Sequence, residues 1–306
     1  MTDQQQTHQH GHRHGHGHDH DDAHMDWDVM APLLELGAEV TSPIVDQAAV
    51  WLRERTEAAG LPKVRRLLDI GSGPGVGACQ LARAFPEAEV VAVDGTPALL
   101  ERTQARAAGL GLAERVRTHL ADLPDGLATV GDADLIWSSM ALHHIGDQES
   151  AVAGLGQALR PGGLLAIAEG GLPMRVLPRD IGFGRPGLHS RLDALNEDWF
   201  NEMRAGLPGA KEAVENWPGF LAAAGLTDVR SRTFLVDLPA PLGADARAYV
   251  QAQLARQHEA AEERLDAEDR AALGRLLDPE DPQGLMRRPD VFLLSARTVH
   301  TAVKPA

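Results

Sequence analysis

The sequence is poor in cysteine, in positive charge and in long hydrophobic runs. Its one cysteine, Cys79, excludes an internal disulfide framework and fits a reducing compartment. No apolar run approaches the length that a transmembrane helix needs. The N-terminal residues lack the basic-then-apolar pattern of a secretory signal. We therefore expect a cytoplasmic protein that does not span a membrane.

Basic residues are outnumbered, with 29 Lys and Arg against 44 Asp and Glu, which leaves a formal net charge of −15. A general nucleic-acid-binding protein needs a basic face that displaces counterions from the phosphates. The charge therefore argues against nucleic acid as a partner and fits a solvated acidic surface. The 306 residues, 43% of them hydrophobic, suffice for one large domain or two small ones.

Residues 1–24 are of low complexity and hold eight of the fourteen histidines, in the stretch "HQHGHRHGHGHDHDDAH". This segment has too little apolar content to fold, so we expect a disordered tail. Imidazole suits Ni²⁺, Zn²⁺ and Cu²⁺, which predicts weak divalent-metal binding by the tail. An incidental metal affinity is the favoured interpretation, and a metal-handling function is the alternative.

The rest of the chain changes its pattern twice. Residues 25–62 have apolar residues at helical spacing, whereas short apolar strands alternate with helices over 63–171. This alternation indicates a parallel sheet covered on both faces, an α/β doubly wound fold. We expect a His-rich tail (1–24), N-terminal helices (25–62), a ligand-binding core (63–171), a cap insert (172–210) and a C-terminal part of the sheet with a helical insertion (211–306).

Beyond the core, the Pro-, Gly- and Arg-rich insert predicts one helix over about 188–205. The C-terminal part predicts a helix over 210–226, a strand over 228–238, a helical stretch over 244–277 and a last strand over 290–300.

Four glycines crowd the stretch "LLDIGSGPGVGACQLARAF", which runs from residue 67 to residue 85. Glycine allows close approach to the backbone, and a strand-to-helix turn presents free N–H groups. The stretch therefore predicts a ligand cradle at the carboxyl edge of the sheet. The string "GPGVGA" matches the dinucleotide fingerprint, but Gly71 and Ser72 separate it from the strand end. The P-loop pattern fails because no Gly-Lys-Ser/Thr follows.

An ordered series of motifs decides between these cradles. Asp69 precedes G-x-G-x-G, "VVAVD" ends at Asp94, "HLADL" carries Asp122, and "DLIWSSMALHHIGD" is followed by "LRPGGLLAIAEG". As a set, this series resembles the small-molecule type of class I, Rossmann-like S-adenosylmethionine-dependent methyltransferases. The resemblance covers about residues 64–171. It implies a seven-stranded, mostly parallel sheet whose last strand, "DVFLLSARTVH", is antiparallel.

The resemblance also implies a role for individual residues in binding S-adenosylmethionine. The glycine loop would lie against its methionine part and ribose, and Asp69 would orient that loop and the amino group of the cofactor. Asp94 would bind the ribose hydroxyls, and Asp122 would bind the adenine amine. The expected cofactor-binding residues are Asp69, Gly71, Ser72, Gly73, Gly75, Asp94, Gly95, Asp122, Leu123, Ser138 and Met140.

Four of these residues lie near particular parts of the cofactor in the structure that the resemblance implies. Ser138 and Met140 would line the cofactor near its sulfonium, and the Leu123 N–H would serve a ring nitrogen of the adenine. Gly95 departs from many relatives, which carry a larger side chain there. The departure leaves the adenine less enclosed unless Thr96 or another element covers it.

Methyl transfer from a sulfonium is an in-line displacement, in which alignment alone supplies about 7–11 kcal/mol. A general base is needed only if the acceptor must lose a proton. His143 and His144 in "ALHHIGD" are the candidates, and packing or capping is their alternative role.

The sequence limits the class of methyl acceptor mainly through the motifs and residues that it lacks. The place of an "NPPY"-type motif reads "SSMA", and a single cysteine disfavours arsenic chemistry. We expect a small organic methyl acceptor, with oxygen the commonest acceptor atom in the family and nitrogen or carbon open. The family's substrate selection implicates residues 25–60 and 172–210. Arginine in that insert suits either an anionic substrate or a solvated cap: Arg175, Arg179, Arg185 and Arg191.

Two other functions stay open at this point. An NAD-dependent oxidoreductase would use "GPGVGA", and a non-catalytic cofactor- or metal-binding protein would use the His-rich tail. The oligomeric state is left open as well.

Overall fold

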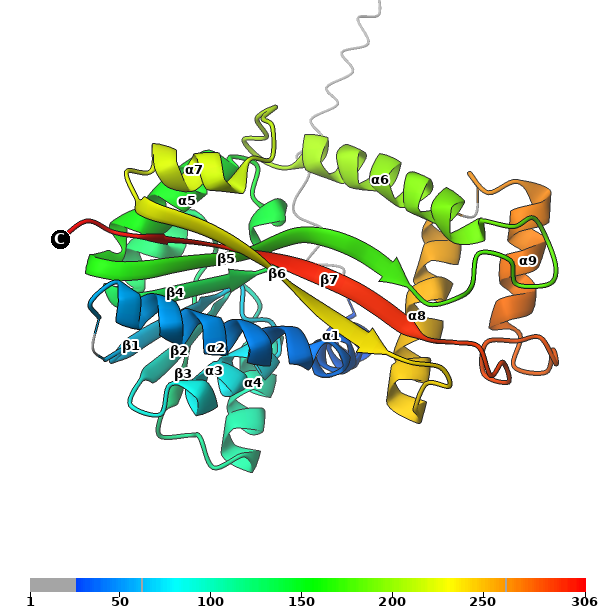
Figure 1. The fold of residues 1–306 in the computed structure, drawn as a ribbon, viewed down its shortest axis with the longest axis horizontal. Helices are drawn as coiled ribbons and strands as arrows, with labels where there is room; N and C mark the ends of the chain where they lie inside the picture. The colour runs from blue at the N-terminus through cyan, green and yellow to red at the C-terminus, as the bar shows by residue number, and fades with distance from the viewer. Residues whose placement is uncertain (1–25, 62, 262) are drawn as a thin grey trace, which may run out of the picture.

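Seven strands form one sheet in the computed structural model, which describes residues 26–61, 63–261 and 263–306 (Figure 1). The strand order is β3-β2-β1-β4-β5-β7-β6, and β7 runs antiparallel to both of its neighbours. The fold expected from the motif series is therefore confirmed. The strands are β1 (Arg66–Ile70), β2 (Glu89–Asp94), β3 (Val116–Leu120), β4 (Ala133–Ser139), β5 (Leu159–Arg175), β6 (Thr227–Leu238) and β7 (Leu293–Val303).

Helices cover both faces of this sheet. The helices α1, α2, α3 and α4 lie on one face, whereas α5 and α7 lie on the other (Figure 1). Asp147 caps α5, because its side chain accepts a hydrogen bond from the Ser150 amide at 3.1 Å. The helices are α1 (Trp27–Val40), α2 (Ser42–Ala58), α3 (Val76–Ala84), α4 (Pro97–Gly109), α5 (Gln148–Gln157), α6 (Leu188–Gly206), α7 (Trp217–Ala223), α8 (Ala244–Ala261) and α9 (Ala267–Leu277).

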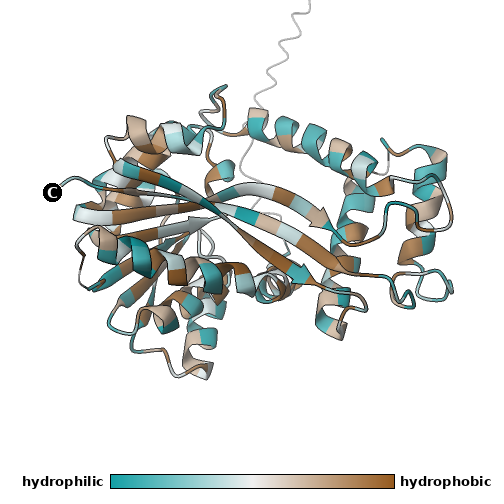
Figure 2. Ribbon diagram, in the orientation of Figure 1, coloured by the Kyte–Doolittle hydropathy of each residue, from teal (hydrophilic) through white to brown (hydrophobic). Residues whose placement is uncertain are grey.

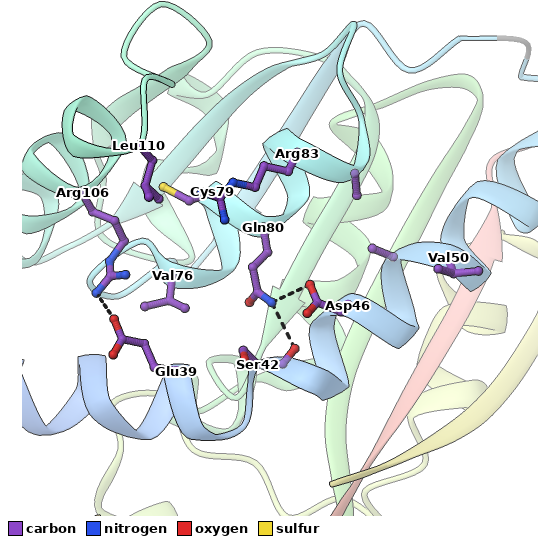
Figure 3. A pocket seen from close by; sticks show the side chains of 12 residues that line it. Glu39, Ser42, Asp46, Val50, Val76, Cys79, Gln80, Arg83, Arg106 and Leu110 are labelled. Carbon is purple, nitrogen blue, oxygen red and sulfur yellow. Dashed lines mark hydrogen bonds and ion pairs between the residues drawn. The ribbon is translucent and has the colours of Figure 1, made fainter. Parts of the chain in front are cut away.

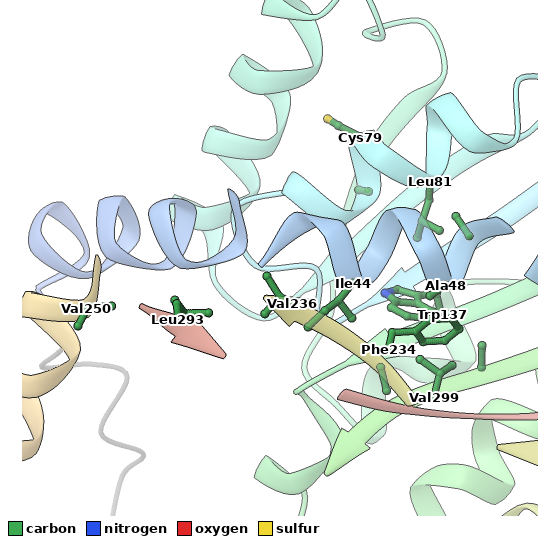
Figure 4. Packing of buried hydrophobic residues seen from close by; sticks show 14 of the residues in the cluster. Ile44, Ala48, Cys79, Leu81, Trp137, Phe234, Val236, Val250, Leu293 and Val299 are labelled. Carbon is green, nitrogen blue, oxygen red and sulfur yellow. The ribbon is translucent and has the colours of Figure 1, made fainter. Parts of the chain in front are cut away.

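The hydrophobic core is divided by the sheet into two clusters. Successive residues of a strand point to opposite faces, so Leu67 joins one cluster and Leu68 the other. The larger cluster packs α2 and α3 on the sheet around the buried Trp137 (Figure 4). The rings of Trp51 and Phe234 lie 5.8 Å apart in the same cluster. Each such buried side chain contributes roughly 1.5–3 kcal/mol, and hydrophobic stretches run along the sheet and the helices that cover it (Figure 2).

Three elements differ from their predicted bounds. The helix predicted over 210–226 forms only from Trp217, because Asn216 caps it by accepting from the Gly219 amide at 3.0 Å. Pro218 then occupies the first turn, where its missing N–H costs nothing. Strand β5 runs to Arg175 and extends beyond the predicted end of the core. The helical stretch predicted over 244–277 is divided into α8 and α9.

Beyond the common core, β5, β6 and β7 continue together and end against a group of helices that we call the C-terminal lobe (α6, α8 and α9; Figure 1). Arg191 ties this lobe together, donating to both carboxylate oxygens of Asp269 at 2.5 and 2.7 Å. Helix α6 is mostly hydrophilic (Figure 2), and its only buried residues are Leu188 and Leu192. The first part of α6 is therefore anchored in the lobe.

No helix in the described part of the chain combines the length and the apolar content needed to cross a bilayer. The metal binding predicted for the His-rich tail concerns residues 1–24, which lie outside the described residues.

One buried carboxylate joins three strands at the amino edge of the sheet. Asp134 in β4 accepts from the backbone amides of Arg65 and Arg66 at 2.7 and 2.9 Å and from the Arg160 guanidinium at 2.8 Å. Burial acts to raise the pKa of Asp134, but the hydrogen bonds from Arg160 and from both amides outweigh it and lower that pKa.

We predict that Asp134→Ala lowers the free energy of unfolding by about 2–4 kcal/mol, because two buried amides and an arginine lose their acceptor. The wild type should lose this contribution as the pH falls through the depressed pKa of Asp134, whereas the variant should not. Urea denaturation at pH 7 and pH 3 measures both effects. An equal pH dependence in the two proteins would contradict the assignment.

Candidate functional site

The glycine loop between β1 and α3 lies at the carboxyl edge of the sheet, and the neighbouring strand holds it. The amides of Gly71 and Ser72 both donate to the Val93 carbonyl, at 2.9 and 3.0 Å. Gly71, Gly73 and Gly75 all have positive φ, which favours glycine. The loop conformation therefore requires the glycines that the sequence places there.

The glycines differ in what surrounds them. A Cβ on Gly71 would lie 2.3 Å from the Cβ of Ala141, and one on Gly75 would lie 2.5 Å from Thr103. A Cβ on Gly73 would meet nothing within 4 Å. Packing within the protein thus explains two of the glycines, whereas the bare side of Gly73 faces open space. This is the position where a ligand can lie against the backbone.

Two carboxylates stand beside the loop. Asp69 is 3% exposed, and burial followed by the charge of Asp94 raises its pKa from 3.8 to about 7. Asp94 accepts from the Gly73 amide at 2.8 Å and from the Thr96 amide at 2.9 Å. Asp94 therefore also fixes the loop to the start of α4. A carboxylate has about four acceptor positions, so these two bonds are compatible with further donors.

The structure shows what fills the space next to Gly95. A Cβ at this position would lie 2.5 Å from Oδ1 of Asp122, an exposed residue. The Asp122 carboxylate thus fills the space beside Gly95 that a larger side chain would take, so an element other than Thr96 covers this position. Leu123 follows, half-buried, and packs on the core.

The residues after β4 are placed differently from one another. Ser138 is fully buried, and its hydroxyl donates to the Ile70 carbonyl at 3.0 Å. Its side chain therefore joins two strands, and the expectation that it lines the site is corrected. Met140 is 41% exposed with a φ of +54°, a backbone conformation that costs about 1–2 kcal/mol. Strain of this kind concentrates at functional sites.

A buried polar atom without a partner also marks the loop. The hydroxyl oxygen of Ser72 is buried and forms no hydrogen bond within the described residues. Together with the bare side of Gly73 and the two carboxylates, it is an arrangement that fits a polar ligand with a cationic part.

A second carboxylate centre holds the chain beyond β4. Glu169 in β5 is 3% exposed, and its Oε1 accepts from the amides of Ala141 and Leu142 at 3.0 and 2.9 Å. Its Oε2 lies 2.9 Å from Nδ1 of His143. An ionised carboxylate only accepts, so Nδ1 carries the proton and Nε2 is left as the basic nitrogen.

Two residues of α6 complete the surroundings of His143. The ring of Phe200 lies 5.7 Å from that of His143. The Arg204 guanidinium donates to the carbonyls of His143 and Ile145 at 2.8 and 2.6 Å. His144 is exposed and stacks on His143, with 4.2 Å between the rings. The structure therefore singles out His143 as the oriented member of the pair.

The arginines of the insert serve the structure of the lobe. Arg175 pairs with Asp193 at 2.5 Å, and Arg185 and Arg191 share Asp269. Arg179 is exposed. Three of the four side chains are thus paired within the protein, as the interpretation as a structural cap expects.

Sequence reasoning missed Glu169 and Arg204. Glu169 ends the apolar run "LLAIAE", as Asp69 and Asp94 end theirs, so the signal was visible at the carboxyl end of a third parallel strand. Arg204 had no such signal, because its role depends on how α6 returns to the sheet.

A hollow of about 490 Å³ lies elsewhere, along the outer face of α3 (Figure 3). Val76, Cys79 and Gln80 form its floor, with the ion pair between Glu39 and Arg106 on one side. None of the residues predicted for the site lines this hollow. The loop geometry therefore locates the candidate site.

Comparison with known proteins agrees with this geometry. Residues 67–163 match a family model described as a methyltransferase domain. Trans-aconitate 2-methyltransferase from Variovorax paradoxus is 36% identical over 107 residues, which cover 35% of this chain and 39% of that protein. Malonyl-[acyl-carrier protein] O-methyltransferase from Laribacter hongkongensis is 34% identical over 134 residues, which cover 40% and 45%.

These matched segments span less than half of either relative. Trans-aconitate 2-methyltransferase from Methylobacterium nodulans is similar over more of its length, at 27% identity, 89% of this chain and 99% of that protein. Among solved structures, phosphoethanolamine N-methyltransferase 2 from Haemonchus contortus, in complex with S-adenosyl-L-methionine, is 20% identical with a TM-score of 0.43. The likeness covers 80% of this chain and 49% of that one.

The sheet order, the motif series and the matched domain together define the class. Residues 67–163 are a methyltransferase domain, and the sheet order and the motif series are those of class I S-adenosylmethionine-dependent methyltransferases. The dinucleotide interpretation of the glycine loop is thereby set aside.

We predict that Gly73→Ala weakens the binding of S-adenosylhomocysteine at least about tenfold, because the methyl group occupies the space against the loop. Gly111→Ala is the matched control, since Gly111 also has positive φ and open surroundings but follows α4. Both variants should lose about 1 kcal/mol of stability to backbone strain. Calorimetric titration separates them, and equal losses of affinity would contradict the cradle.

We predict that Asp69→Asn stabilises the ligand-free protein at pH 8. The raised pKa means that the native state holds an extra proton between pH 3.8 and about 7, so native stability falls as the pH rises through this window. Each pH unit is worth about 1.4 kcal/mol, which sets an upper limit of about 4 kcal/mol. Urea denaturation from pH 4 to pH 8 should show the two proteins converging at low pH. A constant difference would count against a buried, costly carboxylate.

Proposed function

We propose that this protein transfers the methyl group of S-adenosylmethionine to an oxygen of a small organic acceptor. The observation that carries the proposal is the His143–Glu169 pair, which lies on the segment that packs against the glycine loop. Ala141 joins the two parts, since it touches Gly71 and donates its amide to Glu169. A base and a cofactor cradle therefore share one rigid segment.

The glycine loop and its neighbours fit the cofactor. The bare side of Gly73 accommodates the backbone-facing part of the molecule, and Asp94 is the acceptor for the ribose hydroxyls. Asp69 complements the positive amino group, and Asp122 with Leu123 receives the adenine. Met140, exposed and strained, lies at the end of β4 facing the methyl-donating part.

When bound, S-adenosylmethionine supplies a methyl group already activated by a sulfonium. The protein's own contribution is to align the acceptor, to exclude water and to accept a proton. His143 Nε2 accepts the proton of the acceptor hydroxyl, and Glu169 stabilises the imidazolium through Nδ1. Arg204 and the two amides bound to Glu169 hold the imidazole in place.

Oxygen is favoured as the acceptor atom for two reasons. A histidine paired with a carboxylate suits the removal of a hydroxyl proton. In addition, one of the similar proteins is named an O-methyltransferase. Small organic acids or their conjugates appear in the names of both relatives, trans-aconitate and malonyl-[acyl-carrier protein].

We predict that His143→Ala lowers kcat about 10²–10⁴-fold, the usual loss for a general base, and leaves the affinity for S-adenosylhomocysteine unchanged. Glu169→Gln should also lower kcat, because the imidazolium loses its counter-charge. The measurement is formation of S-adenosylhomocysteine from S-adenosylmethionine over a panel of small hydroxylated organic acids.

The control is His119→Ala, a histidine on β3 that bonds Thr129 and should not alter turnover. Tight binding of NAD without binding of S-adenosylhomocysteine would overturn the function. Unchanged turnover in His143→Ala would leave alignment alone as the mechanism and would remove the base.

A further inference from the structure

Strand β5 is irregular immediately after Glu169. The register against β7 passes from Ala168 opposite Val299 to Gly171 opposite Arg297, so β5 contains one extra residue. Gly171 has a φ of +120°, and a Cβ there would lie 2.1 Å from the Ala296 carbonyl oxygen. This is a β-bulge, a device that redirects side chains next to functional sites. It places Arg297 opposite Gly171, two residues beyond Glu169 in β5.

Arg297 differs from the other arginines of the described residues. It is half-buried and forms no hydrogen bond or ion pair there, whereas every other arginine in that part of the chain that is not fully exposed has a partner. A half-buried cation without a partner loses part of its hydration, a cost that native structures keep low by pairing such groups. The lack of a partner at Arg297 therefore indicates that this side chain binds an anion from outside the protein.

Two neighbouring groups, Glu169 and Tyr249, act on the charge of Arg297. Burial lowers the pKa of Arg297, and the charges of Glu169 and Tyr249 partly oppose this. Glu169 accepts from two amides and lies 2.9 Å from Nδ1 of His143, but it forms no hydrogen bond or ion pair with Arg297. Tyr249, the one tyrosine of the chain, projects from α8 against Gly37 of α1, and a Cβ on Gly37 would lie 3.3 Å from its hydroxyl. Tyr249 is half-buried, and no hydrogen bond joins its hydroxyl to another of the described residues.

We propose that Arg297, assisted by the Tyr249 hydroxyl, binds a carboxylate of the methyl acceptor and so selects organic acids as substrates. This assignment rests on the proposed function, because the subsite lies beside the His143–Glu169 pair. The acceptor then presents a hydroxyl to His143 while Arg297 holds its carboxylate.

The chemistry of the subsite favours a carboxylate over a phosphate. Guanidinium binds a carboxylate through two parallel N–H bonds, and a tyrosine hydroxyl adds one donor. The buried charge of Glu169 lies near the same guanidinium and repels a dianion more strongly than a monoanion. A singly charged planar group is therefore the better match.

The test compares wild type with Arg297→Met in the presence of saturating S-adenosylhomocysteine. Calorimetric titration uses three acids and their amides as probes: malonate and malonamide, glutarate and glutaramide, 3-hydroxybenzoate and 3-hydroxybenzamide. Wild type should bind at least one acid more tightly than its amide, and Arg297→Met should lose this preference about 10- to 100-fold. Arg232→Met is the matched control, an exposed arginine on the neighbouring strand β6, and should keep the preference.

A readout on the ligand-free proteins distinguishes binding from a structural role. Removing an unpaired cation should leave the melting temperature of Arg297→Met equal to or above that of wild type. A fall in melting temperature with acid binding intact would overturn the proposal. So would the absence of an acid-over-amide preference in all three pairs, or a dependence on Arg297 for inorganic phosphate alone. Since binding of S-adenosylhomocysteine is measured in the same samples, failure of the methyltransferase function is seen separately.

Discussion

Glu169 connects the parts of this protein that have to act together. A buried carboxylate is costly unless donors surround it, and here two backbone amides and an imidazole do so. The amide donors belong to the segment that packs on Gly71, and the imidazole belongs to His143. Loss of this carboxylate would release the segment from the sheet and the histidine from its orientation at once. The cofactor side and the acceptor side are thus coupled through one side chain.

The acceptor side is built from elements beyond the common core. Strands β5, β6 and β7 extend past their neighbours and support the C-terminal lobe (Figure 1). Helix α6 joins the lobe to the site, because Arg191 binds Asp269 at one end and Arg204 binds the His143 carbonyl at the other. A change in the packing of α8 or α9 would therefore be transmitted to His143. The ion pairs of the lobe therefore matter to the site, because they hold the helix whose Arg204 binds the His143 carbonyl.

The charged side chains differ between the cofactor side and the acceptor side. Asp69 and Asp94 stand close together on the cofactor side, where burial and the charge of Asp94 raise the pKa of Asp69, an arrangement that suits a cationic ligand. Arg297 stands unpaired on the acceptor side, which suits an anion. Two opposite electrostatic preferences therefore lie at one sheet edge, separated by the segment that follows β4.

The sequence by itself determined the sheet, the glycine loop and the order of the motifs, because periodicity and turn chemistry act over a few residues. Asp69, Asp94 and His143 were found in this way, the two aspartates at the ends of predicted strands and the histidine in the segment after one. Only the tertiary structure decided that Ser138 is buried, that Arg175, Arg185 and Arg191 of the insert are paired and that Arg297 is not. Pairing depends on which distant side chains meet, as with Arg191 and Asp269, 78 residues apart. Local patterns carry no information about such contacts.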